Sequence, residues 1–158
     1  MNITVVCVGK IKEKFFTDAI NEYSKRLSRF CKIDIVEVKD IKIPDNPSDK
    51  ECAQVLEKEA ELILAKIPKD SYIIPLCIEG KEFSSPELAD KIRTISMEKS
   101  HITFIIGGSL GMTEDVKRIG SLRLSFGKLT LPHQLMRVVL LEQIYRAFKI
   151  NGGESYHK

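Results

Sequence analysis

The feature that most constrains the fold is a repeated alternation of short apolar runs with longer amphipathic segments. Apolar runs that predict strands occupy residues 2–8, 32–39, 71–79, 102–106 and 121–126. Between them, apolar residues recur every three or four positions, as in a helix with one buried face. Strands that alternate with helices need crossover connections, which produce a parallel sheet covered on both faces. The sequence therefore predicts an α/β fold with a mostly parallel sheet flanked by helices.

Local signals locate the predicted helices. Ser48 followed by Glu51 is a capping-box pattern, in which each side chain satisfies a free backbone N–H at the helix start. Pro86 suits the first helical position, where its missing N–H has no intrahelical partner, and we expect Ser85 to be the cap. The predicted helices are residues 15–30, a segment from Ser48 to Pro68, a segment that begins at Ser85, a short segment between Thr113 and Gly120, and residues 133–150.

The length of the chain suits a single domain over residues 1–158. A chain of 158 residues buries roughly 68–70% of its unfolded surface, and no linker or repeat divides it. No apolar stretch approaches the roughly 20 residues that span a bilayer. No basic segment precedes the first apolar run, as it would in a secretory signal. We therefore expect a cytoplasmic protein that does not enter membranes.

The cysteines and the charges restrict the partners. The four cysteines are spread singly, with no histidine at the spacing of a metal site, so we expect reduced thiols and no metal. The net charge of +3 permits a polyanionic partner without requiring one. Basic clusters would contact phosphates if the fold brought them together. They are Lys10, Lys12 and Lys14; Lys25, Arg26 and Arg29; and Arg137, Arg146 and Lys149.

The last predicted helix is apolar on two sides. One side, suited to the sheet, carries Met136, Val139, Leu140 and Ala147. The opposite side carries Val138, Leu141, Tyr145 and Phe148. Leaving the second stripe in water would forgo roughly 6–12 kcal/mol, at 1.5–3 kcal/mol per large side chain. Either other helices of the chain or a second copy must cover it, and the sequence favours a symmetric homodimer.

Residues 104–116, FIIGGSLGMTEDV, form a strand, a glycine loop and a helix start. The loop lacks the lysine and hydroxyl of a phosphate-binding loop and the glycine spacing of a dinucleotide-binding loop. A second break, SFGKLTLPHQ, ends the next strand. Because ligands of open α/β sheets bind beyond the carboxyl ends of strands, we expect Leu76 and the two loops to enclose one pocket. Glycines there would let main-chain groups reach an adenine edge.

Several motifs resemble those of a known family. IIGGSLG, LTLPHQLMRVVLLEQIYRAFKI and the terminal YHK are together similar to the bacterial large-subunit ribosomal RNA methyltransferase H family, small knotted enzymes of the SPOUT class. The similarity extends over the whole chain. The pattern T-x-P-H-x-x-x-R-x-x-x-x-E-x-x-Y-R-A takes in Thr130, Pro132, His133, Arg137, Glu142, Tyr145, Arg146 and Ala147. Many members carry an arginine before the glycine of NGGES, so Asn151 and Gly152 weaken the expectation of a phosphate contact there.

The resemblance implies a trefoil knot in the C-terminal part of the chain and a homodimer. It also implies S-adenosylmethionine as the methyl donor and N3 of a pseudouridine in 23S ribosomal RNA as the acceptor. The implied cofactor-binding residues are Leu76, Gly107, Gly108, Phe126, Gly127, Lys128, Leu129, Thr130 and Leu131. The substrate side would comprise the C-terminal tail and basic residues of the partner subunit.

The chemistry of such a reaction suggests further candidates. A sulfonium methyl group is already electrophilic, so the protein mainly aligns it with the acceptor nitrogen and excludes water. The imide nitrogen must lose its proton, which a base or a stabilising cation would assist. His133, His157 and Arg146 are the candidates, although a structural role explains His133 equally well, and no catalytic base is assigned. Tyr156 and His157 are expected to contact an exposed RNA base, the alternative being a disordered chain end.

Two other functions are compatible with the residues. One is a nicotinamide- or other nucleotide-binding α/β enzyme, which the missing fingerprint after the first strand disfavours. The other is a non-catalytic ribosome- or RNA-binding factor, which the basic clusters and the lack of an assignable base support. The sequence leaves open whether the substrate is free RNA, a ribosomal subunit or the assembled ribosome.

Overall fold

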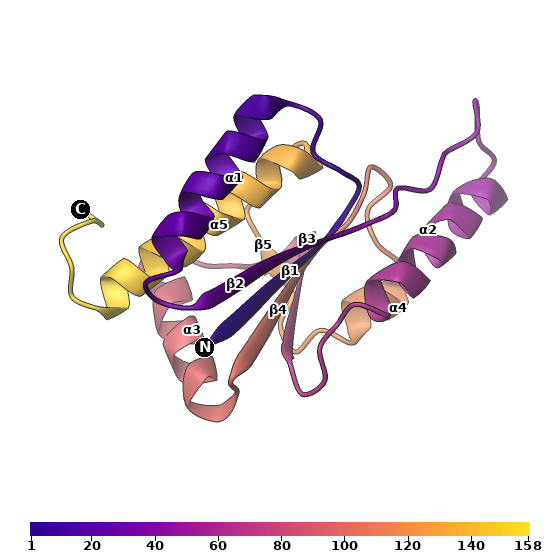
Figure 1. Cartoon of the computed structure of the whole chain (residues 1–158). Coiled ribbons are helices and arrows are strands. Elements are labelled where there is room, and N and C mark those ends of the chain that lie inside the picture. The colour runs from indigo at the N-terminus through magenta and orange to yellow at the C-terminus, as the bar shows by residue number, and fades with distance from the viewer.

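The computed structural model describes residues 1–158 and contains one five-stranded sheet with helices on both faces (Figure 1). Its strands are β1 (Asn2–Val8), β2 (Lys32–Val38), β3 (Tyr72–Glu82), β4 (His101–Ile106) and β5 (Leu124–Ser125). They lie in the order β2-β1-β4-β3-β5, and every neighbouring pair is parallel. The predicted α/β class and parallel sheet are confirmed.

The helices divide between the two faces of the sheet, three on one side and two on the other (Figure 1). The larger core lies under α1 (Lys14–Leu27), α3 (Ser85–Glu98) and α5 (His133–Asn151). The smaller core lies under α2 (Asp49–Leu64) and α4 (Glu114–Arg118). Because side chains alternate along a strand, β1 contributes Val5 to the larger core and Val6 to the smaller. No helix has the length and hydropathy needed to cross a bilayer.

The cap of α3 differs from the sequence prediction by one residue. Ser84, not Ser85, is the N-cap: its hydroxyl accepts from the backbone N–H of Glu87 at 3.3 Å, and the Glu87 carboxylate accepts from the Ser84 N–H at 2.7 Å. A capping box needs a serine three residues before the glutamate, which selects Ser84. Ser85 instead donates to Gln143 of α5 at 2.7 Å. The capping box of Ser48 and Glu51 is confirmed.

The fifth strand is much shorter than predicted. Residues 121–126 alternate in the way that a strand does, yet only Leu124 and Ser125 form one. The residues before them bond to β3 irregularly: the N–H of Ser121 donates to the Ile73 carbonyl, and the Arg123 carbonyl accepts from Lys81. The register shifts between Leu76 and Lys81. Because the register of β3 is irregular here, residues 121–123 cannot form regular hydrogen bonds with it, and β5 is short.

The second apolar stripe of α5 is covered within the chain, so the inference that a second copy covers it is wrong. Helix α1 packs along α5, and Leu141 and Tyr145 are buried. The ring of Phe30 stacks on Phe148 with centroids 5.6 Å apart, and the ring of Tyr23 lies 6.4 Å from Tyr145. The predicted homodimer therefore needs support other than this stripe.

Candidate functional site

A pocket of about 240 Å³ lies beyond the carboxyl ends of β4 and β5 and beside residues 76–79 in the middle of β3, where the sequence predicts Leu76 and the two loops to meet. All of the predicted cofactor residues except Lys128 line it, namely Leu76, Gly107, Gly108, Phe126, Gly127, Leu129, Thr130 and Leu131. Lys128 is exposed and lies outside the lining. Sequence reasoning missed several neighbours in the wall: Cys77, Ile78, Glu79, Ile106, Gly111, Met112, Lys117, Leu124 and Met136.

Pro75 explains why β3 can form one wall of the pocket. Pairing between β3 and β4 ends at Pro75, opposite Ile105. Proline has no N–H to donate to the ladder, so the strand separates from its neighbour there. The residues that follow, 76–79, consequently face the pocket rather than β4.

The two glycine-containing loops bring main chain to the pocket. A Cβ on Gly107 would lie 2.5 Å from the carbonyl oxygen of Gly111, so only glycine allows this close approach. Gly127 has a φ of +111°, and a Cβ there would meet nothing within 4 Å. Its N–H donates to the hydroxyl of Ser125 at 3.1 Å, which fixes the loop. The backbone of this loop is therefore unshielded on the side of the pocket.

The charges in the pocket wall compensate each other. The Nζ of Lys117 donates to the carboxylate of Glu79. The hydrogen bond raises the pKa of Lys117 and lowers that of Glu79, so both stay charged as a pair at neutral pH. Apart from this pair, the titratable side chains in the lining are those of Cys77 and His133. Such a nearly neutral wall suits an adenosine group, which needs hydrogen-bonding partners rather than charge.

His133 lies at the start of α5 and reaches the pocket as predicted. Burial and the positive charge of Arg137 lower the pKa of His133, and Asp40 partly opposes them. The imidazole is therefore neutral at physiological pH. Neutral imidazole can donate a hydrogen bond from one ring nitrogen and accept one at the other, which a structural role and a proton-accepting role both require.

Arg137 holds the start of α5 against the sheet. It is fully buried and donates to Glu37 at 2.7 Å and to the carbonyls of Val8 and Gly9 at 3.0 and 2.8 Å. The helix start is thereby fixed to the carboxyl ends of β1 and β2, one turn from His133. The expectation that Arg137 joins a phosphate-binding cluster is wrong, because its guanidinium is buried and binds Glu37 and two backbone carbonyls.

The remaining predicted substrate residues form a cluster around Glu142, which we call the tail cluster: Glu142, Arg146, Tyr156 and His157. Arg146 donates twice to one oxygen of Glu142, at 3.0 and 2.7 Å. The phenol of Tyr156 donates to the other oxygen at 3.0 Å. The Arg146 guanidinium lies 4.7 Å from the Tyr156 ring centroid, and its Nη1 lies 3.2 Å from Nδ1 of His157. Sequence reasoning missed the role of Glu142, although the residue belongs to the family pattern.

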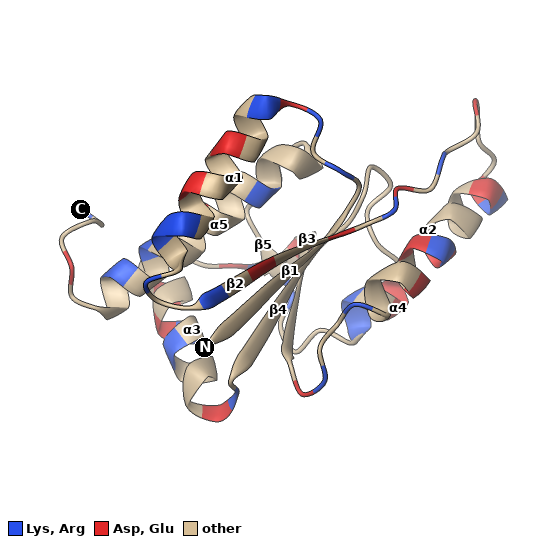
Figure 2. Cartoon of the chain, in the orientation of Figure 1, with Lys and Arg blue, Asp and Glu red and all other residues tan.

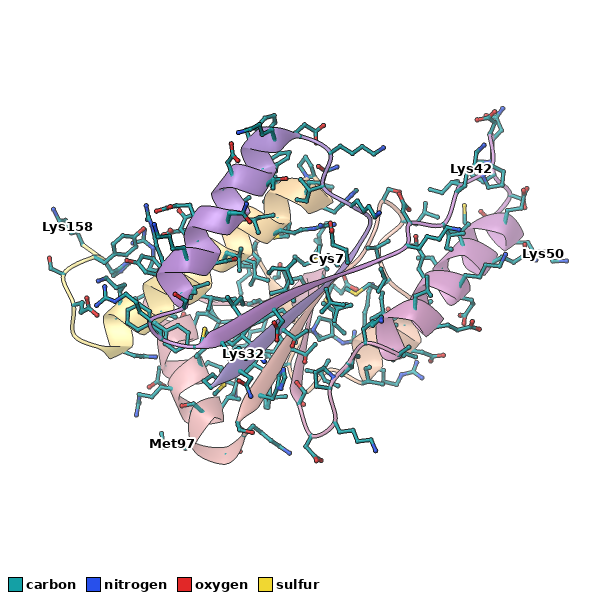
Figure 3. All side chains as sticks on the ribbon, viewed as in Figure 1. Cys7, Lys32, Lys42, Lys50, Met97 and Lys158 are labelled. Carbon is teal, nitrogen blue, oxygen red and sulfur yellow. The ribbon has the colours of Figure 1, made fainter.

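The pocket and the tail cluster lie at opposite ends of α5. His133 and Arg146 are thirteen residues apart on the helix, which is about 20 Å at 1.5 Å per residue. The C-terminus lies at the far end of α5 from the helix start (Figure 1), and Lys158 is at the outer edge of the molecule (Figure 3). A single chain therefore does not bring the predicted cofactor residues together with Arg146, Tyr156 and His157.

Known proteins are similar to this chain in sequence over its full length. Residues 1–157 match a family described as "Predicted SPOUT methyltransferase". A protein of Methanococcus maripaludis is 60% identical over 100% of both chains. Proteins named ribosomal RNA large subunit methyltransferase H from Clostridium novyi and Leuconostoc mesenteroides are 55% and 54% identical, also over 100% of both chains.

One solved structure shows a related fold at low sequence identity. It is titled "The structure of a probable methylase family protein from Haemophilus influenzae Rd KW20" and is 15% identical, with a TM-score of 0.54. The match covers 99% of the present chain and 70% of that chain.

Proposed function

The chain belongs to the SPOUT methyltransferase family, and from that premise we propose the reaction that it catalyses. Members of this family use S-adenosylmethionine as the methyl donor. We propose that the acceptor is N3 of a pseudouridine in 23S ribosomal RNA and that the enzyme works in the cytoplasm. The names of the full-length relatives support large-subunit ribosomal RNA as the substrate.

The pocket is the observation that carries the proposal. Main chain of Gly107 and Gly127 would hold the adenosine part, and the apolar side chains of Leu76, Phe126 and Leu131 would exclude water. When bound, the donor supplies an electrophilic methyl group. The protein then has to align that group and keep the site dry, which needs no covalent nucleophile. A neutral wall with unshielded backbone is suited to this task.

The tail cluster supports a site shared between two protomers. Arg146, Tyr156 and His157 offer a cation, a phenol and an imidazole to an unstacked base. The cation of Arg146 would stabilise the negative charge that the acceptor imide develops as it loses its proton. Because the cluster lies about 20 Å along α5 from its own pocket, it can serve only the pocket of another protomer. We therefore propose a homodimer in which each tail completes the partner's site.

Deleting residues 155–158 tests the proposal. The deletion should abolish methyl transfer while the affinity for S-adenosylmethionine stays within a few-fold of the intact protein. Calorimetric titration measures the affinity, and labelled S-adenosylmethionine with ribosomes from an unmethylated strain measures transfer. An equal loss of binding and transfer would contradict this division of roles. No transfer by the intact protein, together with tight ribosome binding, would instead support the non-catalytic binding factor.

The same transfer assay identifies the form of the substrate. Free 23S RNA, the large subunit and the assembled ribosome are offered separately at equal concentration. The substrate is the form with the highest kcat/KM. Treatment of the labelled RNA with nucleases then locates the modified nucleotide, and label at a base other than pseudouridine would contradict the proposed acceptor.

A further inference from the structure

Exposed cations of α1 lie directly beside the tail cluster. Lys25, Arg26 and Arg29 occupy the last turn of α1 and the residues just after it, and all three are exposed. The Arg26 guanidinium lies 5.7 Å from the ring centroid of Tyr145 on α5, and Arg29 lies 5.6 Å from that of Phe30. Tyr145 in turn makes an edge contact with Tyr156 of the tail, with centroids 5.0 Å apart. Arg26 and Arg29 are thus joined to the tail through a continuous set of rings.

Charge and topology place these cations on one end of the molecule. Figure 2 shows basic residues of the end of α1, the start of β2 and the last turns of α5 at the same end as the C-terminus. We call this region the α1–α5 surface and define it by Lys25, Arg26, Arg29, Lys32 and Lys149. Cations that alternate with aromatic rings are typical of surfaces that bind single-stranded nucleic acid.

A shallow hollow lies on the α1–α5 surface. Its lining contains Arg29 and Lys32, together with the hydroxyl-bearing residues Ser24 and Ser28, and includes no acidic residue. The positive charges of Arg29 and Lys32, without a competing carboxylate in the lining, suit an anion such as a phosphate. The hollow is open, as a site for a polymer backbone that passes across it must be.

Most of these cations are free to bind an anion. Lys25, Arg29 and Lys32 take part in no ion pair of the structure. Arg26 pairs with Glu22 at 2.9 Å, but both side chains are largely exposed, and such pairs contribute little to stability. A phosphate can therefore displace Glu22 at small cost. Lys149 is the exception, because it pairs with Glu154.

We propose that the α1–α5 surface binds the phosphates of an unpaired RNA segment that flanks the methylated nucleotide. This rests on the proposed function, which puts the target base at the tail cluster beside the surface. Unpaired RNA is favoured over duplex because N3 of the proposed target lies on the base-pairing edge, which is exposed only where the RNA is unpaired. The surface would supply affinity, whereas the tail would supply the contacts to the target.

Two matched triple variants test the proposal in the full-length protein. Lys25→Gln, Arg26→Gln and Arg29→Gln remove three charges from the surface. Lys58→Gln, Lys66→Gln and Lys69→Gln remove three exposed charges from α2 and the residues after it, on the other face of the sheet. Binding of a mixed-sequence single-stranded RNA oligonucleotide, and of the same sequence as a duplex, is measured over a range of salt concentrations.

We expect the surface variant to reduce the slope of log affinity against log salt by about 2, since each lost contact to single-stranded RNA contributes roughly 0.7. Its KM for the ribosomal substrate should rise about tenfold or more, whereas kcat and the affinity for S-adenosylmethionine stay unchanged. The α2 variant should match the unmodified protein. The unmodified protein should prefer the single strand to the duplex.

Three results would overturn the proposal: an unchanged salt slope and KM in the surface variant, an equal loss in the α2 variant, or a preference for duplex. Failure of the proposed function looks different. In that case the unmodified protein transfers no methyl group, while its RNA binding still depends on the surface cations. Circular dichroism of both variants checks that neither loss reflects unfolding.

Discussion

Glu142 connects the C-terminal tail to the body of the chain through both carboxylate oxygens. One oxygen accepts from Arg146 and the other from Tyr156. Burial and a hydrogen bond to Glu142 raise the pKa of Tyr23 to about 12, and the same causes raise the pKa of Tyr156. Both phenols therefore remain donors, and the tail residues are held in a defined arrangement before RNA arrives.

Glu142→Gln should lower the pKa of both phenols, because it removes the negative charge that opposes their ionisation. Ultraviolet absorbance of phenolate follows this directly, since the chain has no tryptophan. Methylation should fall in kcat/KM by about tenfold or more, because a hydrogen bond to a charged group is worth about 1.5–3 kcal/mol. Glu154→Gln, which removes the tail's other ion pair, to Lys149, is the control and should leave both phenols unchanged. An unaltered phenol titration in Glu142→Gln would contradict this role.

His133 makes the stability of the protein depend on pH. Burial lowers its pKa below the ordinary value of 6.5, so on acidification the unfolded chain binds a proton before the folded chain does. The free energy of unfolding must therefore fall as pH drops below 6.5, and this contribution is fully present above that value. His133→Gln should flatten the dependence, as measured by urea unfolding between about pH 7 and about pH 5.5. A slope identical to that of the unmodified protein would show that His133 is not responsible.

The start of α3 shows how a helix boundary depends on one residue. Ser84→Ala should lower the free energy of unfolding by about 1 kcal/mol, because it removes the acceptor for the Glu87 N–H. Ser84→Asp retains an acceptor and should cost much less. Urea unfolding at a fixed protein concentration measures both, since subunit association would also affect stability. Equal losses in the two variants would mean that the cap contributes nothing.

The spacing of apolar residues predicts where the helices and strands lie better than it predicts which parts of the chain pack against them. The apolar spacing locates α5 almost to the residue, and the alternation in residues 2–8 gives β1 with its correct bounds. It does not show that Phe30, more than a hundred positions earlier, covers Phe148. It also predicts a strand over 121–126, because alternation cannot reveal that β3 is irregular beside it. Both errors arise because the sequence of a helix or strand does not reveal which distant part of the chain packs or pairs with it.

The residues of the pocket could largely be predicted from the sequence, whereas the role of Arg137 beside it could not. The glycine loops and Leu76 follow from the rule that ligands bind beyond the carboxyl ends of parallel strands, together with the family resemblance. Burial of Arg137 was not predictable, since its partners Val8 and Gly9 lie at the other end of the chain. The trefoil knot and the single domain over residues 1–158 stay predictions.

A site shared between protomers makes a prediction for the whole molecule. Gly107→Val should destroy the pocket by steric conflict with Gly111, and deletion of residues 155–158 should destroy the tail. Each variant alone should be inactive. After the two are denatured and refolded together, about a quarter of the unmodified activity should return, because half of the random dimers contain one intact site of two. No recovery, with mixed dimers demonstrated by mass spectrometry, would place the complete site within one chain.

The walls of the pocket come from residues that all follow Pro75 in the chain, from Leu76 to Met136. During synthesis, β1, α1 and β2 can associate while no place for the methyl donor yet exists. Donor binding therefore belongs to the completed fold alone and stabilises it against unfolding, by about 2.7 kcal/mol when the ligand is a hundredfold above its dissociation constant. Cells rich in S-adenosylmethionine should accordingly protect the finished enzyme from proteolysis while leaving truncated chains unprotected.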